Sequence, residues 1–297
     1  MVAAMLSRRL RSAFAVLVAG SAATLGGAPP APAATQRSTS SNWAGYAVSR
    51  SPTKFRHIRG DWVQSAIDCS TAPGTYSSAW VGIGGFHSTS QALEQIGTEA
   101  DCSTGGQARY STWYEVVPDT SHSAKLTIAA GDHMRASVAV AGTAVTLRLW
   151  NLTKGTSFTK VVHAPAVDTT SAEWIVEAPS LCTSMTNCIS TPLANFGSTT
   201  FTAAQAVSST GHAGTIGDPA WSATAIDLTL GGGGRRFIDA RRAGLGGGGE
   251  AKTGDLGADG ASFAVNYQAS SAPAPPTGPA QTDPGQTATP PSAALRH

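Results

Sequence analysis

The chain has 297 residues and a net charge of +2, and only 13% of its residues are charged, against about a quarter in ordinary soluble proteins. A chain so close to neutral has no electrostatic footprint for nucleic acid, so we expect no nucleic-acid partner. Few carboxylates also suit an acidic exterior, because acid denaturation largely reflects the forced protonation of paired carboxylates.

The first 34 residues are typical of an export signal. Arg8, Arg9 and Arg11 precede an apolar run from Ala13 to about Leu25, and Ala31-Pro32-Ala33-Ala34 supplies small residues for cleavage. The run is too short to span a bilayer. We therefore expect residues 1–34 to be a signal peptide, by the Sec or the Tat route, that is removed on secretion. Its removal changes the net charge from +2 to −1 and leaves no membrane anchor.

Residues 35–270 are predicted to form one all-β domain. Short runs of β-branched and aromatic residues alternate with turn residues, and we find no long amphipathic helix. Many short strands at regular spacing indicate a sandwich or a barrel. The expected strands are Trp43–Val48, Gly60–Ile67, Ala79–Ile83, Leu93–Ile96, Tyr110–Val117, Lys125–Ala129, Met134–Val140, Ala144–Trp150, Ser157–Val162, Glu173–Glu177, Thr199–Ala204, Thr224–Leu230 and Ser262–Tyr267.

The last residues, 271–297, are rich in proline, alanine and threonine and have almost no large apolar side chain. Such a segment cannot bury enough surface to offset the entropy lost on ordering. We expect a disordered tail.

Four cysteines allow three disulfide pairings. We favour Cys69–Cys102, which would join two early loops, and Cys182–Cys188, which would close a short loop. No pair has C-x-x-C spacing and no histidine cluster accompanies them, so we expect no zinc site.

One predicted strand carries two carboxylates. Side chains alternate along a strand, so Glu173, Ile175 and Glu177 share one face while Trp174 and Val176 share the other. The two glutamates could simply be solvated on the wet face of a sheet, and this segment alone does not decide between that and a site.

Other hydrolase motifs are weak or missing. The mature domain has no G-x-S-x-G, and the chain has no H-E-x-x-H. Asp119-Thr120-Ser121 and Asp168-Thr169-Thr170 loosely resemble aspartic-protease elbows, but neither sits in a glycine-closed loop, so we set that interpretation aside.

Five segments supply the aromatics, amides and carboxylates that could line a groove for an extended polymer. Their content and order resemble the glutamic peptidases, or eqolisins, peptidase family G1, over roughly Ser40 to Gln268. The segments are Ser41–Gly45, Ala79–Gly85, Glu94–Cys102, Trp113–Glu115 and Ala172–Glu177.

The resemblance implies a concanavalin-like jelly-roll sandwich of two antiparallel sheets and a bacterial, secreted, acid-active endopeptidase without metal or cofactor. It implies Gln95 and Glu177 as the catalytic pair, with Glu177 as general base and then acid, and Gln95 as the oxyanion donor. It further implies that the site is lined or supported by Trp43, Trp80, Glu99, Trp113 and Glu115.

Two features depart from the family pattern. Fungal members carry an aspartate where this chain has Gly84, so any hydrogen bond from that side chain is lost or replaced. They also have a substantial propeptide, whereas few residues separate Ala34 from Ser41, so neutral pH alone would have to keep the enzyme inactive.

A secreted lectin-like sandwich that binds carbohydrate is the alternative, because its concave face would also carry aromatics and acids. A lectin has no need of the Gln95 and Glu177 pair. We expect a monomer that acts on proteins or peptides.

Overall fold

The computed structural model describes residues 35–70, 72–182, 188–229, 248–269 and 294–296. These residues contain strands and turns but no helix, and so no helix that could cross a membrane. The predicted signal peptide and most of the predicted tail lie outside the described residues, and their boundaries remain predictions.

The described chain is built from strands that pair antiparallel, except β1, which runs parallel to β16. The strands are β1 (Gln36–Ser40), β2 (Trp43–Ser49), β3 (Phe55–Val63), β4 (Tyr76–Gly84), β5 (Leu93–Cys102), β6 (Ala108–Val116), β7 (His122–Ser123), β8 (His133–Ala141), β9 (Ala144–Asn151), β10 (Thr156–His163), β11 (Ser171–Glu177), β12 (Ser180–Cys182), β13 (Cys188–Ser190), β14 (Ser198–Ser208), β15 (Ala213–Thr215), β16 (Ser222–Leu228), β17 (Glu250–Thr253), β18 (Phe263–Gln268) and β19 (Ala294–Arg296).

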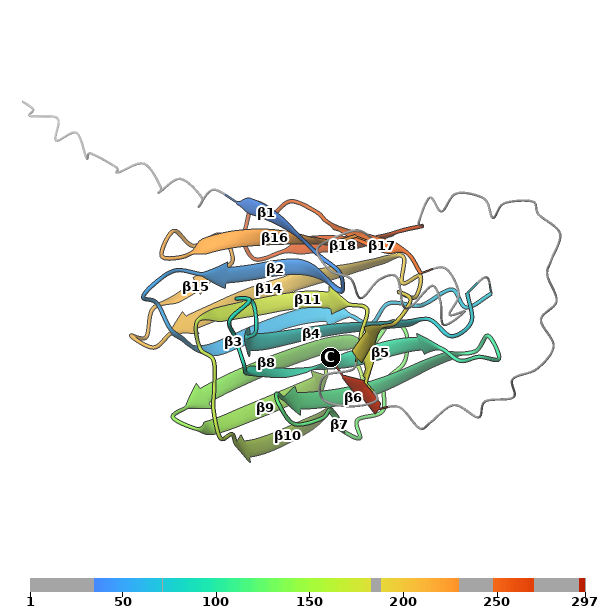
Figure 1. The fold of residues 1–297 in the computed structure, drawn as a ribbon, viewed down its shortest axis with the longest axis horizontal. Coiled ribbons are helices and arrows are strands. Elements are labelled where there is room, and N and C mark those ends of the chain that lie inside the picture. The colour runs from blue at the N-terminus through green and yellow to red at the C-terminus, as the bar shows by residue number, and fades with distance from the viewer. Residues whose placement is uncertain (1–34, 71, 183–187, 230–247, 270–293, 297) are drawn as a thin grey trace, which may run out of the picture. The chain divides into compact units, whose positions relative to one another are not determined.

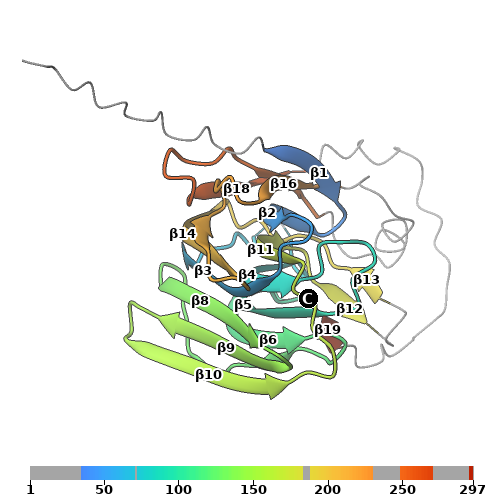
Figure 2. The same cartoon turned by 90° about the vertical axis from the view of Figure 1, so that its left-hand side faces the viewer.

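The strands form two packed layers (Figures 1 and 2). One layer has the order β10-β9-β8-β3-β14, and the other has the order β16-β2-β11-β4-β5-β6-β7. Strands β18 and β17 join the layers along one edge, so hydrogen bonding runs continuously through both. Strands β3 and β8 pack against β4 without pairing with it, which places the layers face to face. The predicted all-β sandwich is confirmed.

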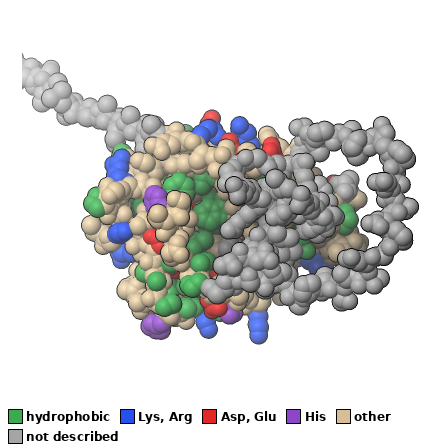
Figure 3. Space-filling model, viewed as in Figure 1, with side chains coloured by type: hydrophobic (Ala, Val, Ile, Leu, Met, Phe, Trp, Pro, Cys, Tyr) green, Lys and Arg blue, Asp and Glu red, His purple; other side chains and the backbone are tan. Residues whose placement is uncertain are grey.

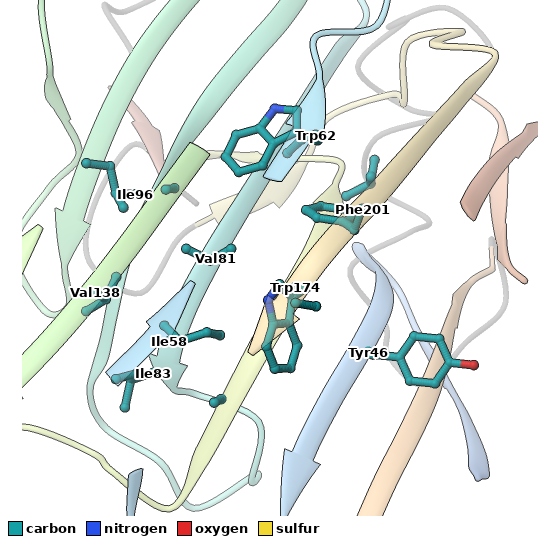
Figure 4. Close-up of a cluster of buried hydrophobic side chains, with 14 of the residues drawn as sticks. Tyr46, Ile58, Trp62, Val81, Ile83, Ile96, Val138, Trp174 and Phe201 are labelled. Atoms are coloured by element: carbon teal, nitrogen blue, oxygen red, sulfur yellow. The ribbon is translucent and has the colours of Figure 1, made fainter. Parts of the chain in front are cut away.

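The main core lies between the layers, where large apolar side chains from both meet (Figure 4). Trp174 of β11 is fully buried there, near Ile58 and Phe201 of the other layer, and its Nε1 donates to the carbonyl of Arg59 at 2.8 Å. Gly60 makes room for this ring, because a Cβ at that position would lie 2.7 Å from it. Burying such a side chain contributes on the order of 2–3 kcal/mol.

A second, smaller apolar cluster lies on the opposite face of the β2–β11–β4–β5 layer. Because side chains alternate along each strand, this face also carries Glu173 and Glu177. The cluster consists of Ala47, Trp80, Leu93, Trp113, Ile175 and Ile226.

Two strand predictions cover several residues that do not lie in a strand, and the others differ from the structure only in where the strand begins or ends. Lys125–Ala129 is not a strand: Lys125 has a φ of 51°, in the left-handed region, which interrupts an extended run. The strand expected at Gly60–Ile67 is β3, Phe55–Val63. Charged residues obscure the apolar pattern of this strand in the sequence, although Arg56, Arg59 and Asp61 all occupy its less buried positions.

The tail also contributes a short strand. β19, Ala294–Arg296, pairs with β12, within the segment predicted to be disordered. Nothing in the composition of residues 271–297 indicates this pairing, because the partner strand lies more than a hundred residues earlier.

The predicted disulfide Cys69–Cys102 is confirmed, with a Cα–Cα distance of 5.3 Å. It joins the segment before β4 to the end of β5, the strand that carries Gln95. Cys182 and Cys188 lie opposite each other where β12 pairs with β13. Their side chains are not among those described, so that bridge remains a prediction.

Candidate active site

Neighbouring strands β11, β4, β5 and β6 bring polar side chains together on the face that carries the smaller cluster. Glu173, Gly82, Gln95 and Glu115 occupy one row across these strands. Glu177 lies four residues further along β11, opposite Ser78 of β4 and Trp43 of β2. The row through Ser78 continues to Glu99 and Ser111.

Gln95 is fully buried and held by one hydrogen bond. Its Nε2 donates to Oε2 of Glu115 at 2.9 Å, while its Oε1 has no partner among the described residues. An amide nitrogen carries two hydrogens, so this bond leaves one hydrogen for another acceptor. Glu115 thereby fixes the orientation of an amide that can still donate.

Glu177 is 1% exposed and receives a hydrogen bond on each carboxyl oxygen. Asn42 Nδ2 donates to Oε1 and Trp80 Nε1 donates to Oε2, both at 2.8 Å. Trp43 packs edge-on against the Trp80 ring, with centroids 5.1 Å apart. Burial raises the pKa of Glu177 to about 8. The hydrogen bond from Trp80 opposes this rise, and the nearby charge of Glu115 adds to it.

Asn42 is a further site residue, which belongs to the Ser41–Gly45 motif but was not predicted to act in the site. Its backbone carbonyl accepts the N–H of Ala178, so the end of β11 is tied to the start of β2. This bond places the Asn42 side chain over Glu177. The signal in the sequence was its position directly before Trp43.

The remaining predicted site residues surround this centre. Trp113, 2% exposed, packs in the smaller apolar cluster. Glu99 accepts a hydrogen bond from Ser111 Oγ at 2.6 Å. Burial raises the pKa of Asp101 to about 8, and the charge of Glu99 adds to this rise. Glu99 therefore acts on Asp101, whereas Glu115 is the carboxyl that contacts Gln95.

Glu173 shares the face of Glu177 but not its surroundings. It is fully buried, and neither carboxyl oxygen has a hydrogen-bond partner among the described residues. Burial holds its pKa well above the usual value; the Ser171 hydroxyl opposes this rise, and the charges of Asp168 and Glu94 add to it. Burial favours the protonated form of Glu173, as it does that of Glu177, so the two carboxyls differ in their hydrogen-bond donors and not in the direction of their pKa.

An open groove adjoins Glu177. It has a volume of about 420 Å³, and Asn42 and Trp43 connect it to the buried carboxyl. Its other described lining residues, none of them charged, are Ser38, Thr39, Ser40, Gly85, Phe86 and Ile226. Figure 3 shows apolar side chains exposed in the middle of the molecular face that carries β2, β11 and β4 in Figure 1. An extended, uncharged chain segment would fit such a groove.

The arrangement supplies an acid or base next to an open groove, with an amide donor and a second carboxyl on the same face of the sheet. These are the groups needed for proton transfer and for stabilising a developing negative charge. The described residues contain no group of three or more His, Cys, Asp or Glu side chains arranged to hold a metal ion.

Comparison with known proteins agrees with this class of fold. The Peptidase A4 family model matches residues 41–233, and the chain therefore belongs to the Peptidase A4 family, a family of peptidases. No curated protein matches the chain.

Solved structures show the same fold. One is scytalido-glutamic peptidase with a peptide-based transition-state analogue: 24% identity, a TM-score of 0.60, and coverage of 77% of this chain and 98% of that chain. Another is SCP-B, a member of the eqolisin family, in complex with the tripeptide Ala-Ile-His: 23% identity, a TM-score of 0.58, and the same coverage.

Proposed function

We propose that the protein is a secreted, acid-active endopeptidase in which Glu177 and Gln95 hydrolyse peptide bonds without a metal or cofactor. One observation carries this proposal: the buried Glu177 carboxyl has a donor on each oxygen, and one of those donors, Asn42, lines the uncharged groove. The family membership of the chain supports the peptidase class.

Glu177 moves the proton. Its charge interacts with that of Glu115, and two interacting carboxyls lose their protons in two separate steps. Between those steps the pair holds one proton, which the raised pKa of Glu177 places mainly on Glu177. The reacting form is the fraction of molecules in which that proton lies on Glu115. Ionised Glu177 then takes a proton from water, whose oxygen attacks the peptide carbonyl carbon. Glu177 returns the proton to the leaving nitrogen as the C–N bond breaks.

Gln95 stabilises the intermediate. Its second Nε2 hydrogen donates to the carbonyl oxygen as that oxygen becomes negative, a contribution on the order of 3 kcal/mol. The bond to Glu115 keeps the amide from rotating. Asn42 and Trp80 donate to Glu177 and favour its ionised form.

The titration of this pair sets the working pH range. The raised pKa of Glu177, about 8, marks the pH above which the pair has lost its last proton. Activity should therefore lie on the acid side and disappear as the pH rises through about 8.

Export has separate support. The N-terminal sequence has the features of a signal peptide, and the Cys69–Cys102 disulfide is a feature of oxidising compartments. The mature protein recovered from culture medium should begin near residue 35.

Digestion of unfolded casein between pH 2 and pH 9 tests the proposed activity. Cleavage at internal peptide bonds on the acid side, unchanged by EDTA, is the expected result, and the Glu177→Gln protein is the control. A wild-type protein that cleaves no peptide at any pH but is retained on a glycan column would favour the lectin-like alternative.

A further inference from the structure

Asp168 connects two segments next to the candidate active site. It lies just before β11, and its Oδ1 accepts the backbone N–H of Thr170 at 2.9 Å and the Thr170 hydroxyl at 2.7 Å. Its Oδ2 accepts a hydrogen bond from Ser90 Oγ. Ser90 Oγ in turn accepts the N–H of Gly85 at 3.2 Å, and the Gly85 nitrogen also lies 3.5 Å from Oδ2. One carboxylate thus joins the start of β11 to the loop that follows β4.

The backbone of that loop lies directly on Asp168. Gly84 has a φ of 87°, and a Cβ added there would lie 2.8 Å from Asp168 Cβ and 2.5 Å from its carbonyl oxygen. Contacts this short exclude any side chain at Gly84. The turn and Asp168 therefore fit together as a close pair.

The loop held in this way forms a wall of the groove. Gly85 and Phe86 line the groove together with Asn42 and Trp43, and Phe86 also packs against the smaller apolar cluster. A shift of this loop would widen the groove without moving Glu177, which is fixed by strand pairing with β2 and β4.

Hydrogen bonds stabilise the ionised form of Asp168. Burial alone would raise the pKa of Asp168, but hydrogen bonds from Ser90, Thr170 and Gly85 outweigh it and hold the pKa below its usual range. The ionised carboxylate faces two buried acids, Glu94 of β5 and Glu173 of β11, and raises the pKa of both. Asp168 is therefore the ionised member of this group in a mildly acidic medium.

We propose that Asp168 is a positioning residue for substrate binding, which clamps the Gly85–Phe86 wall of the groove to the strand that carries Glu177. The proposal rests on the proposed peptidase function. It assigns two roles: Glu177 and Gln95 act on the scissile peptide bond, whereas Asp168 fixes the shape of the groove surface that binds the rest of the substrate.

Hydrogen exchange and steady-state kinetics test this proposal with two substitutions. Asp168→Ala removes both acceptors, whereas Asp168→Asn keeps an oxygen for Thr170 and an amide that can donate to Ser90. Asp68→Ala is the matched control, because exposed Asp68 accepts the same two bonds from the residue two positions on, Ser70. A peptide substrate with a large apolar residue beside the cleaved bond is the probe.

Asp168→Ala should raise KM about tenfold, the size expected for a lost hydrogen bond to a charged group, and leave kcat within about twofold. Amides of residues 84–92 should exchange faster, while the rest of the chain exchanges as in the wild type. Asp168→Asn should give a KM and exchange rates between those of Asp168→Ala and the wild type, and Asp68→Ala should match the wild type in both.

Unchanged exchange at residues 84–92 in Asp168→Ala would overturn the proposal. So would a fall in kcat at constant KM, because a merely destabilised protein loses active molecules without changing the affinity of those that remain. If the wild-type protein cleaves no peptide, the proposed function fails, and exchange alone then decides whether Asp168 holds the loop.

Discussion

At the scale of single residues, Glu173 and Glu177 show how surroundings decide what a carboxyl can do. They lie four positions apart on one face of one strand. Glu177 receives hydrogen bonds from Asn42 and Trp80, while Glu173 has no partner on either oxygen among the described residues. The sequence of β11 cannot distinguish them, because the donors come from segments about a hundred residues or more earlier in the chain.

Gln95→Ala should reduce kcat by about a hundredfold with a smaller change in KM, because the amide acts on the negative charge that appears only during the reaction. The double variant with Glu177→Gln should be little worse than Glu177→Gln alone, since both groups act on one transition state. Steady-state kinetics on a single peptide gives both comparisons. A Gln95→Ala protein with raised KM and normal kcat would assign the amide to substrate binding instead.

Trp80→Phe should shift the alkaline limb of the pH profile to higher pH. The Trp80 hydrogen bond lowers the pKa of Glu177, so its loss raises that pKa further above about 8. Trp62→Phe is the matched control, because Trp62 Nε1 donates to Thr98 Oγ1 at 3.1 Å in the core between the layers. Trp62→Phe should lower stability and leave the alkaline limb of the pH profile in place. Equal shifts in both variants would show that the Trp80 hydrogen bond does not lower the pKa of Glu177.

At the scale of elements, the sequence predicted strands best where apolar and polar or small residues alternate, as in β8 and β9. It missed short strands such as β1 and β17, whose pairing depends on strands elsewhere in the fold. The sequence also could not predict the pairing register across β11, β4, β5 and β6. That register places Gln95 in the row of Glu173, four residues from Glu177. The family resemblance named the site residues, but it could not give their hydrogen-bond partners.

The β12–β13 pair carries an element-scale prediction. Cys182 and Cys188 are opposite each other in its register, so we expect them to be linked. Peptide mapping without reduction should recover the two cysteines in one linked fragment, and an alkylating reagent should label neither in the native protein. Labelling of either one would rule the bridge out.

At the scale of the whole molecule, buried acids should make the fold more stable in acid than at neutral pH. Burial raises the pKa of Glu94, Asp101 and Glu177 to about 8 and that of Glu173 well above its usual value. Between about pH 4 and pH 8 the folded chain therefore binds more protons than the unfolded chain, and the free energy of unfolding falls as the pH rises through that window.

Thermal unfolding at pH 4.5 and at pH 8 measures this effect, and Tm should be several degrees lower at pH 8. Below about pH 4 the trend should reverse, because Asp132 and Asp168 have lowered pKa values and lose favourable contacts on protonation. A Tm that is equal or higher at pH 8 would show that these four acids are ionised in the folded protein.

The most direct test of the catalytic assignment is the turnover of folded Glu177→Gln beside folded Glu173→Gln at the pH of maximum activity. Glu177→Gln keeps the shape of the side chain but removes the proton acceptor, so kcat should fall by a factor on the order of a thousand. Glu173→Gln replaces a protonated acid by a neutral amide of the same shape and should retain most of the activity. Near-wild-type turnover by a correctly folded Glu177→Gln protein would contradict the assignment, and loss of activity in Glu173→Gln alone would move the base to that residue.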